Sequence, residues 1–574
     1  MVRQRWHGGL FSHGVTPGNF DRRSRAISWK STPIFSGALL FLCRFVDVRT
    51  DTEHVLGALL AYCPRGLSFR RSRPFPRNRA GLAERRAGSG GATSLVAEVV
   101  STRDSFARLG DIPSESFRRQ LHELADWIAD YRATIGNRIV APNTVAGAIV
   151  GALPSHPPEQ PEPFANIWND FEEIVLPGIV HWGHPQFMGY FGSTTTGPGI
   201  LAEMIAAALN VNTMTWRTSP AATELETVVL RWLREWLGLP ESFEGVVYDT
   251  ASISTLHALA AAREQAASLV RESGLTGRDL PVFRLYTSDQ AHSSVEKAAI
   301  ALGLGERNVR RVSTDSAFRM EMTALKQLVE EDLRRGFKPI AVVATVGTTS
   351  SASIDPIETI ARFCRKHTIW LHIDAAYGGG LALLPEATAI REGWADADSF
   401  VINPHKMLFV PFDFSALYVR EIARLRRVFA LVPDYLGGDS ARAEIDYMDY
   451  GVQLGRRFRA IKAWLVWRSF GREGMAARIR EHLRLARLFA QWLEKDGRFE
   501  ILAPVTMGVV CFAPIGYSDE ACGTLVDQLN ANGETYLTRT KLHSRVAIRL
   551  GLGNVLTTEK HVQKVWQLIR DAIE

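Results

Sequence analysis

The sequence predicts an α/β protein that is built on a mostly parallel sheet. From about residue 185 to about residue 475, short apolar segments alternate with longer helical ones, so that GVVY at 245–248 is followed by STLHALAAAREQAASLV. Uninterrupted apolar strands separated by helices are typical of parallel sheets that helices cover on both faces. Small, hydroxyl or charged residues directly follow these apolar segments. In α/β proteins, binding sites gather where strands end and helices begin.

Five segments are predicted as strands of this sheet. They are GVVY (245–248), PVFRLY (281–286), PIAVVATV (339–346), IWLHID (369–374) and SFVIN (399–403). Helical patterns such as SSVEKAAIALG and PIETIARFCRKH lie between them, and we therefore expect a large domain at residues 185–478. The later segments FEILAP, GVVCFAP and SRVAIRLGL have helical flanks and predict a small α+β domain at residues 479–574.

Residues 111–184 are predicted to form an N-terminal helical arm. Apolar residues recur there at steps of four and three, which places them on one face of a helix. These residues are Phe117, Leu121, Leu124, Ile128 and Tyr131. A proline-rich connector, LPSHPPEQPEP at 153–163, leads to a second helical stretch. Such an arm seldom buries its apolar face alone, so we expect it to pack against a partner chain.

Residues 1–110 are predicted to be a basic, mostly disordered leader. They are rich in Arg, Pro, Gly and Ser and keep no sustained period of 2 or 3.6. The first 100 residues contain 16 Lys and Arg against 6 Asp and Glu, a formal charge of +10, so the rest of the chain carries −4 of the total of +6. A nucleic-acid-binding arm and a transit peptide are the alternatives for this leader, but basic low-complexity runs are common without either role. We therefore expect a non-essential extension, with neither a nucleic-acid partner nor a membrane partner.

The composition is that of an ordinary soluble protein, with 46% hydrophobic and 22% charged residues. Its five cysteines show neither a CxxC pair nor the spacing of metal ligands. We therefore expect reduced thiols, no metal site and a cytoplasmic location. The longest early apolar run, at 34–43, is too short to span a bilayer.

One lysine stands in an unusual place, in the stretch NPHKML at 403–408. Apolar segments flank Lys406 on both sides, and a buried ammonium group costs several kcal/mol unless it is paired or changes its chemical state. Three other features follow strands of the same sheet. The segment DTAS at 249–252 opens a helix whose N-terminus can bind an anion, and His292 and Asp374 each follow a strand of their own. Pyridoxal phosphate is a cofactor that needs these three features: an anion site, a carboxylate for a ring nitrogen and a lysine for a Schiff base.

The motifs DQAHSSVEKAA, VGTTSSASIDP, WLHIDAAYGG, NPHKML and LGRRFRAIKAW carry a family resemblance. From about residue 113 to the C-terminus, the chain resembles the group II pyridoxal-phosphate-dependent decarboxylases, which include aromatic-L-amino-acid, histidine and glutamate decarboxylases. The resemblance implies fold type I, the aspartate-aminotransferase-like fold, with pyridoxal 5'-phosphate as the cofactor. It also implies a carboxy-lyase whose small-molecule substrate is an amino acid and which forms a homodimer with active sites at the interface.

The resemblance further implies roles for single residues. Lys406 would form the Schiff base, Asp374 would pair with the pyridine nitrogen, and His292 would stack on the ring and help to bind the substrate. Tyr435, which stands 29 residues after the lysine, would protonate the α-carbon. The implied cofactor contacts are Ala251, Ser252, His292, Thr349, Asp374, Ala376, His405 and Lys406, with His405 as a candidate for phosphate contact or proton handling. The implied substrate contacts are Trp182, Tyr190, Phe191, Ser193 and His292.

A few single residues bear on the type of reaction and on the substrate. Tyr435 favours decarboxylation, because relatives that form aldehydes typically carry Phe there. Gly455 and the run FVPFDFSALYV resemble the aromatic branch, whereas Met407, Asn212 and Met214 depart from it. We expect an aromatic L-amino acid (tyrosine, tryptophan, phenylalanine or dopa) to be converted to its amine and carbon dioxide. The alternatives are a decarboxylase of glutamate or another small acidic or polar amino acid, an aldehyde synthase, and a non-catalytic binding protein that keeps the fold.

Overall fold

The computed structural model describes residues 110–431 and 444–573. In this part of the chain, the larger sheet has seven strands in the order β1-β7-β6-β5-β4-β2-β3. Pairing is parallel from β3 through β2, β4 and β5 to β6, whereas β7 runs antiparallel to both β6 and β1. The strands are β1 (Glu244–Tyr248), β2 (Phe283–Ser288), β3 (Val309–Val312), β4 (Lys338–Thr345), β5 (Trp370–Asp374), β6 (Ser399–Ile402) and β7 (Ser415–Val419). The predicted α/β class with a mostly parallel sheet is confirmed.

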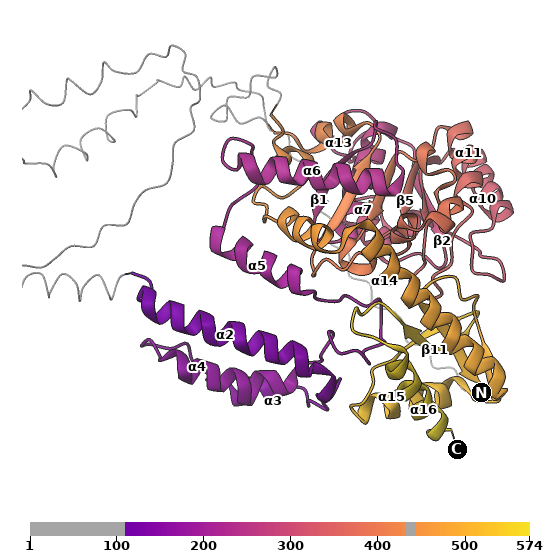
Figure 1. Cartoon of the computed structure of the whole chain (residues 1–574). Coiled ribbons are helices and arrows are strands. Elements are labelled where there is room, and N and C mark those ends of the chain that lie inside the picture. The colour runs from indigo at the N-terminus through magenta and orange to yellow at the C-terminus, as the bar shows by residue number, and fades with distance from the viewer. Residues whose placement is uncertain (1–109, 432–443, 574) are drawn as a thin grey trace, which may run out of the picture. The chain divides into compact units, whose positions relative to one another are not determined.

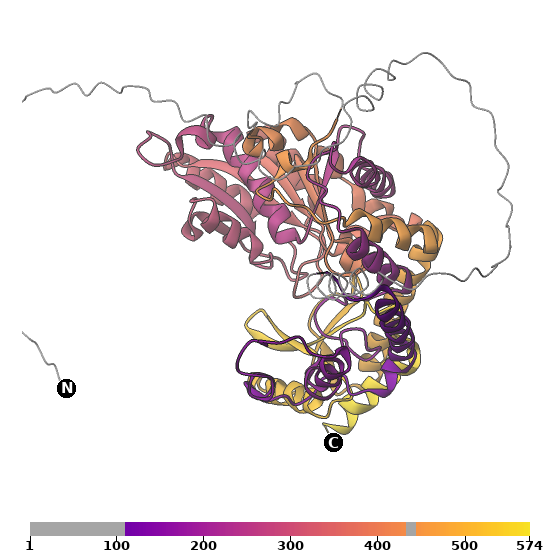
Figure 2. The same ribbon diagram turned by 90° about the vertical axis from the view of Figure 1, so that its left-hand side faces the viewer.

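Helices cover both faces of this sheet, which explains why its central strands β5 and β6 are buried along their whole length (Figure 2). The helix α7 packs on both α9 and α13, and α10 and α11 pack on β4. Their bounds are α7 (Ala251–Ala266), α8 (Val270–Ser273), α9 (Ser294–Ala301), α10 (Met322–Arg334), α11 (Ile357–His367) and α13 (Ile422–Phe429). Two strands, β3 and β7, were not predicted from the sequence. In β3, two arginines in the VRRV segment hide the apolar pattern.

The register of the sheet brings several strand ends to one edge. Asp374, the last residue of β5, pairs with Thr345 at the end of β4. Ser415, the first residue of the antiparallel strand β7, pairs with Tyr248 at the end of β1. The segments that follow β1, β4, β5 and β6 therefore meet the segment that precedes β7, and α12 (Pro404–Met407) lies among them.

The N-terminal arm consists of α2 (Ser114–Thr134), α3 (Ala148–Ala152) and α4 (Phe164–Asp170), which lie side by side (Figure 1). The ring of Trp127 on α2 makes edge contacts with Trp168 and Phe171. No residue of α2 is buried, and Phe117 on its apolar face is 53% exposed. The helix predicted from the apolar period is thus present, and the described residues cover its apolar face only in part.

A second sheet lies near the C-terminus and is antiparallel, in the order β10-β11-β9-β8. It consists of β8 (Phe499–Ile501), β9 (Val509–Pro514), β10 (Thr538–Leu542) and β11 (Arg545–Gly551), with α15 (Asp519–Ala531) and α16 (Glu559–Asp571) beside it. This arrangement agrees with the predicted α+β character of the C-terminal part.

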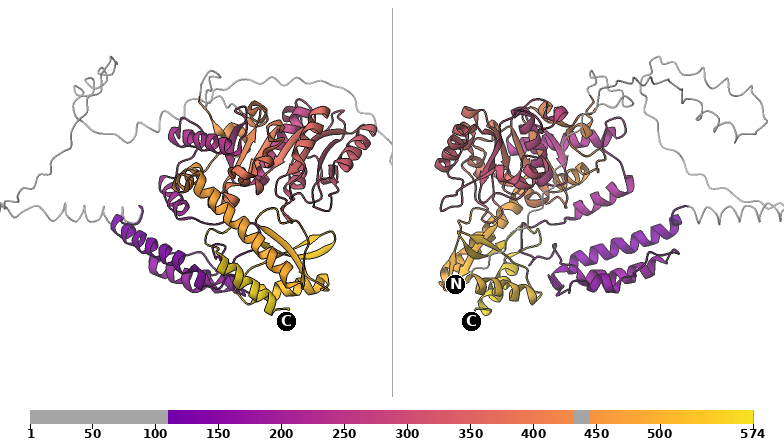
Figure 3. Two further views of the ribbon diagram at one scale, coloured as in Figure 1. Left: turned by 45° about the vertical axis from the view of Figure 1, so that its right-hand side comes forward. Right: turned by 180° about the vertical axis from the view of Figure 1, so that it is seen from behind.

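One long helix joins the two sheets. α14 (Ala460–Asp496) contacts α5 (Gly197–Leu209) and α6 (Pro220–Leu237) and continues to β8, β9 and α16 (Figure 3). It is interrupted at Gly471, whose φ of 64° lies outside the helical region. The domain boundary predicted between residues 478 and 479 falls inside this helix. Within residues 110–431 and 444–573, no helix combines the length and the apolar character that a bilayer span requires.

Candidate active site

A cavity of about 650 Å³ lies at the edge where the strands of the larger sheet end. Eight of the residues that were predicted from the sequence to form the site line it. They are Trp182, Tyr190, Phe191, Ser193, His292, Thr349, His405 and Lys406. Segments more than 200 residues apart in the sequence thus contribute to one site. This agrees with the prediction that residues after different strands meet at one edge of the sheet.

Lys406 lies on the short helix α12, directly after β6, and its amine faces the cavity. Its Nζ stands 4.9 Å from the centroid of the Phe191 ring. Burial lowers the pKa of Lys406, Asp374 opposes this shift, and the positive charge of Arg549 adds to it. A lowered pKa raises the fraction of neutral amine, which is the form that attacks an aldehyde.

Asp374 ends β5 and is 5% exposed, so it lies behind the cavity wall rather than in it. Its Oδ1 accepts a hydrogen bond of 3.1 Å from the N–H of Ala376. The carboxylate acts on the charges of both Lys406 and His292. It therefore supplies negative charge at the inner end of the site, where a cationic ring nitrogen would need it.

Two neutral histidines line the cavity. Burial is the main cause that lowers the pKa of His292, and its Nδ1 accepts a hydrogen bond of 3.1 Å from the N–H of Ser294. Burial lowers the pKa of His405 to about 3, and its Nδ1 accepts a hydrogen bond of 2.9 Å from the N–H of Phe414. In a neutral imidazole whose Nδ1 accepts, Nε2 carries the proton. Both rings can therefore donate a hydrogen bond from Nε2.

The N-terminus of α7 lies at the same edge of the sheet. Ala251 and Ser252 form its first turn, and its N-cap residue Thr250 makes no side-chain capping bond. The N–H groups of a first turn have no partner inside the helix, and the positive end of the helix dipole attracts anions. Ala251 and Ser252 do not line the cavity of the described structure, and neither does the buried residue Ala376.

These groups fit the pyridoxal phosphate that was predicted from the sequence. Three buried oxygens near the strand ends have no hydrogen-bond partner within the described residues, namely Ser288 Oγ, Thr345 Oγ1 and Asn403 Oδ1. Buried polar groups without partners are rare in folded proteins, so a polar molecule is expected beside them. The site also offers one group for each part of the cofactor. The N-terminus of α7 suits the phosphate, the carboxylate of Asp374 suits the ring nitrogen, and the amine of Lys406 suits the aldehyde.

Aromatic rings form the outer wall of the cavity. Trp182 and Tyr190 stack with their centroids 5.4 Å apart and are both about half exposed. Phe191 stacks on Tyr377 at 3.9 Å. Ser193 Oγ donates a hydrogen bond of 3.0 Å to the carbonyl oxygen of His405, which ties this wall to the segment of the lysine. The wall offers flat apolar surfaces to a substrate side chain.

Arg549 on β11 also lines the cavity and is 4% exposed, although it was not predicted from the sequence. Its guanidinium lies 4.7 Å from the Phe191 centroid, and it donates to the carbonyl oxygens of Ser350 (3.1 Å) and Tyr190 (2.5 Å). Its Nη2 is buried without a partner, and no ion pair joins it to a carboxylate in the described part of the chain. The sequence feature that could have identified Arg549 is a charged residue inside the apolar run VAIRLGL. A charged residue among apolar neighbours was also the feature that identified Lys406.

Other cavity residues from the C-terminal part of the chain were also missed. They are Asn530, Tyr536, Thr538, Arg539 and Thr540, among others. No motif marks them, because they come from a helix end and an edge strand of ordinary polar composition. Tyr435, the predicted proton donor, lies outside the described residues.

Comparisons with known proteins point to one family. Residues 147–515 match the family described as "Pyridoxal-dependent decarboxylase conserved domain". The chain is 38% identical over 473 residues to aromatic-L-amino-acid decarboxylase from Cavia porcellus, which covers 80% of this chain and 97% of that protein. It is 35% identical over 479 residues to phenylacetaldehyde synthase from Arabidopsis thaliana, which covers 81% of this chain and 97% of that protein.

A solved structure is similar over the same extent. Tryptophan decarboxylase from Catharanthus roseus, in complex with L-tryptophan, superposes with a TM-score of 0.76 at 33% identity. This match covers 81% of the present chain and 99% of that chain.

Proposed function

Because this chain belongs to the pyridoxal-dependent decarboxylase family, we propose that it converts an aromatic L-amino acid into the corresponding amine and carbon dioxide. Its fold is that of the fold type I enzymes, and its cofactor is pyridoxal phosphate. The observation that carries the aromatic assignment is the stacked pair Trp182 and Tyr190 at the mouth of the cavity that holds Lys406. Relatives that are named for aromatic amino acids support it.

Each residue near the cavity has a proposed task. Pyridoxal phosphate, when bound, accepts the electron pair that carbon dioxide leaves behind. Lys406 would hold the cofactor covalently through its amine, and Asp374 would hold the proton on the pyridine nitrogen. His292 lies against the ring and helps to bind the substrate, while Ala251 and Ser252 bind the phosphate at the start of α7. Tyr435 delivers a proton to the α-carbon.

The remaining contacts complete the proposed site. His405 donates its Nε2 proton to the phosphate, and Thr349 and Ala376 line the ring. Trp182, Tyr190, Phe191 and Ser193 surround the substrate side chain.

The test of the proposed function is carbon dioxide release from a panel of L-amino acids. Tyrosine, tryptophan, phenylalanine and dopa should be decarboxylated with a kcat/KM at least about tenfold above that for glutamate, since a misfit in an apolar pocket costs about 1 to 3 kcal/mol. A preference for glutamate would overturn the aromatic assignment. Pyridoxal-phosphate binding without any decarboxylation would favour a non-catalytic binding protein.

A second candidate function is an aldehyde synthase, because the phenylacetaldehyde synthase from Arabidopsis thaliana is about as similar to this chain as the decarboxylases are. Such an enzyme consumes dioxygen and forms hydrogen peroxide together with the aldehyde. Peroxide and amine measured in the same reaction distinguish the two functions. The tyrosine at position 435 is the sequence feature that favours the amine.

Arg549 is proposed to bind the carboxylate of the amino acid. Arg549→Met keeps an apolar side chain against Phe191 but removes the guanidinium and its free Nη2. Because a hydrogen bond to a charged group contributes about 1.5 to 3 kcal/mol, we expect kcat/KM to fall by about tenfold to a hundredfold, mainly through KM. Steady-state kinetics of the holoenzyme measure this change.

The matched control for this variant is Arg539→Met, which removes an exposed arginine at the rim of the same cavity. It should keep kcat/KM within about twofold of the wild type, because exposed ion pairs contribute little. An unchanged KM in Arg549→Met would contradict the assignment. A selective loss of cofactor affinity would instead assign Arg549 to the phosphate.

The proposed assembly is a homodimer whose arm, residues 113–180, packs on the partner chain, with the active sites at the interface. The exposed apolar face of α2 and the exposed Leu201 and Leu209 on α5 support it, because apolar surface of this extent favours association. Light scattering at micromolar concentration should give the mass of two chains. The mass of one chain in an active sample would contradict the proposal.

The proposed location is the cytoplasm. Cys364, Cys511 and Cys522 are free and buried in the described part of the chain, which suits a reducing compartment. Fractionation of cells with an antibody against the chain tests this location.

A further inference from the structure

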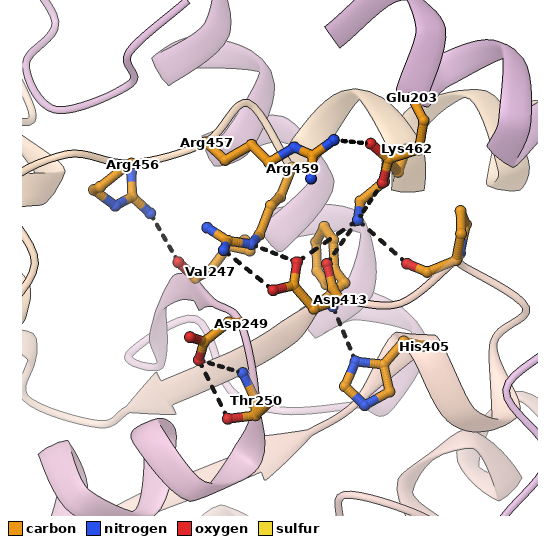
Figure 4. A network of polar contacts seen from close by, with 12 residues as sticks. Glu203, Val247, Asp249, Thr250, His405, Asp413, Arg456, Arg457, Arg459 and Lys462 are labelled. Atoms are coloured by element: carbon orange, nitrogen blue, oxygen red, sulfur yellow. Dashed lines mark hydrogen bonds and ion pairs between the residues drawn. The ribbon is translucent and has the colours of Figure 1, made fainter. Parts of the chain in front are cut away.

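A buried lysine on α14 holds a turn behind the candidate active site (Figure 4). Lys462 is 1% exposed, and its Nζ donates hydrogen bonds to the carbonyl oxygens of Pro411 (3.2 Å) and Asp413 (2.7 Å). Glu203 on α5 pairs with the same Nζ at 2.8 Å. We name residues 411–414 the 411–414 turn. Two of its backbone carbonyls are therefore fixed by one buried ammonium group.

The side chain of the same turn has a second anchor. Arg459 binds the Asp413 carboxylate with two hydrogen bonds, from Nε to Oδ1 at 2.9 Å and from Nη2 to Oδ2 at 3.2 Å. Lys462 Nζ lies 3.8 Å from the same Oδ1. Two parallel bonds of this kind fix direction as well as distance. Asp413 is thus held through both its backbone and its carboxylate.

Removing an ammonium group from water costs free energy that an apolar side chain of the same volume does not cost. Burial lowers the pKa of Lys462, and the carboxylate of Glu203 opposes that shift. Apolar residues of similar volume often replace buried ion pairs without loss of stability. The specific result of the contacts of Lys462 is the position of the 411–414 turn.

The turn directs one backbone N–H at an active-site histidine. Phe414 donates to Nδ1 of His405 at 2.9 Å, and this bond leaves the proton of the neutral ring on Nε2. His405 lines the cavity, and Figure 4 shows its second ring nitrogen on the side of the ring away from the dashed hydrogen bond. The position of the turn therefore determines both the tautomer and the direction of the His405 ring.

The same turn lies beside the start of α7. Ser415, the next residue along the chain, pairs with Tyr248 at the end of β1. Its Oγ is 2.9 Å from Oγ of Ser254 in the first turns of α7. In Figure 4, Asp249 and Thr250 lie near Asp413 and His405. An imidazole N–H donor and a helix N-terminus thus lie at the same edge of the sheet, and both groups favour an anion such as a phosphate.

We infer that Lys462 is a positioning residue for the phosphate of the cofactor, acting through the 411–414 turn and the tautomer of His405. This inference rests on the proposed function, since it takes His405 and the start of α7 as the phosphate contacts. It assigns no catalytic step to Lys462. It predicts that the contribution of Lys462 depends on the phosphate group of the ligand and on no other part of it.

The test compares pyridoxal phosphate with pyridoxal, which lacks the phosphate. Both are titrated into the full chain after removal of its cofactor, and the dissociation constants are measured from the visible absorbance of the bound aldehyde. Lys462→Met should raise the Kd of pyridoxal phosphate by about tenfold to a hundredfold and change the Kd of pyridoxal by less than about twofold. Lys462→Arg keeps a buried cation and should recover most of the lost affinity.

Arg457→Met is the matched control. Arg457 pairs with the same Glu203 but makes no contact with the 411–414 turn, so both dissociation constants should stay near the wild-type values. An equal loss for both ligands in Lys462→Met would mean a general structural role and would overturn the inference, as would no loss for either. If Lys462→Met does not fold, the same ratio is measured in Asp413→Asn, which weakens the other anchor of the turn, and the same outcomes decide.

A double-variant cycle tests the route through His405. In a His405→Phe background, Lys462→Met should cause little further loss of pyridoxal-phosphate affinity, because the donor that it positions is already gone. Additive losses would overturn this route. Failure of the wild-type chain to bind pyridoxal phosphate would instead refute the proposed function, so the two failures are distinguishable.

Discussion

Lys406→Ala is expected to lower amine production by about four orders of magnitude or more. Lys406 lies on α12 and lines the cavity, and in the proposed function covalent attachment through its amine would hold the cofactor at a fixed place. Correct placement of reacting groups is equivalent to effective concentrations of about 10⁵ M or more, so its loss is large. The visible absorbance of the covalently bound cofactor should disappear at the same time.

Rate and absorbance measured on the same purified variant decide this prediction. Lys338→Ala is the control, because Lys338 Nζ is exposed, donates to the carbonyl oxygen of Ala266 and lies outside the cavity. It should retain the wild-type rate and spectrum. Near wild-type decarboxylation by Lys406→Ala would show that another group binds the cofactor. Addition of a small primary amine should restore part of the rate, since it replaces the missing side-chain amine.

Tyr435→Phe is expected to change the product as well as the rate. If the Tyr435 hydroxyl protonates the α-carbon, its removal should leave cofactor binding, substrate binding and carbon dioxide release intact. General acid catalysis contributes about a hundredfold to ten-thousandfold, so amine formation should fall by that factor. Dioxygen then reacts at the unprotonated carbon, and one dioxygen and one water yield the aldehyde, ammonia and hydrogen peroxide in place of the amine.

Amine, peroxide and dioxygen consumption are measured together in this experiment. Tyr450→Phe is the matched control, because Tyr450 is half-buried outside the cavity, and it should keep amine as the product. Unchanged amine output from Tyr435→Phe would identify another proton donor, with His292 and His405 as the candidates that line the cavity. A wild-type enzyme that already forms peroxide in proportion to carbon dioxide would support the aldehyde synthase instead.

Much of the fold could be predicted because its signals are local. The five predicted strands are continuous apolar runs, and each corresponds to a strand of the larger sheet within about two residues. β3 escaped prediction because it is a short edge strand whose two arginines remain partly exposed. α2 was predicted correctly from its apolar period, although no tertiary contact buries any of its residues.

The sequence by itself determined which chemistry the site can hold. Lys406 and Asp374 stand at the ends of apolar segments, and an apolar strand that ends at a charged residue can be recognised from the sequence. Parallel strands expose their carboxyl ends at one edge, so these residues had to meet there. The motifs around them carried the family resemblance, and the comparisons confirm that family.

Only the tertiary structure decided which other groups reach the cavity and how they are oriented. Arg549 meets the Phe191 ring across more than 350 residues of chain, and Lys462 reaches the 411–414 turn from another helix. The proton of His405 is on Nε2 because a backbone N–H nine residues later binds Nδ1. Local patterns specify helices and strands through backbone preference and solvent exposure, whereas such contacts depend on how distant elements pack, and no short stretch of sequence encodes that packing.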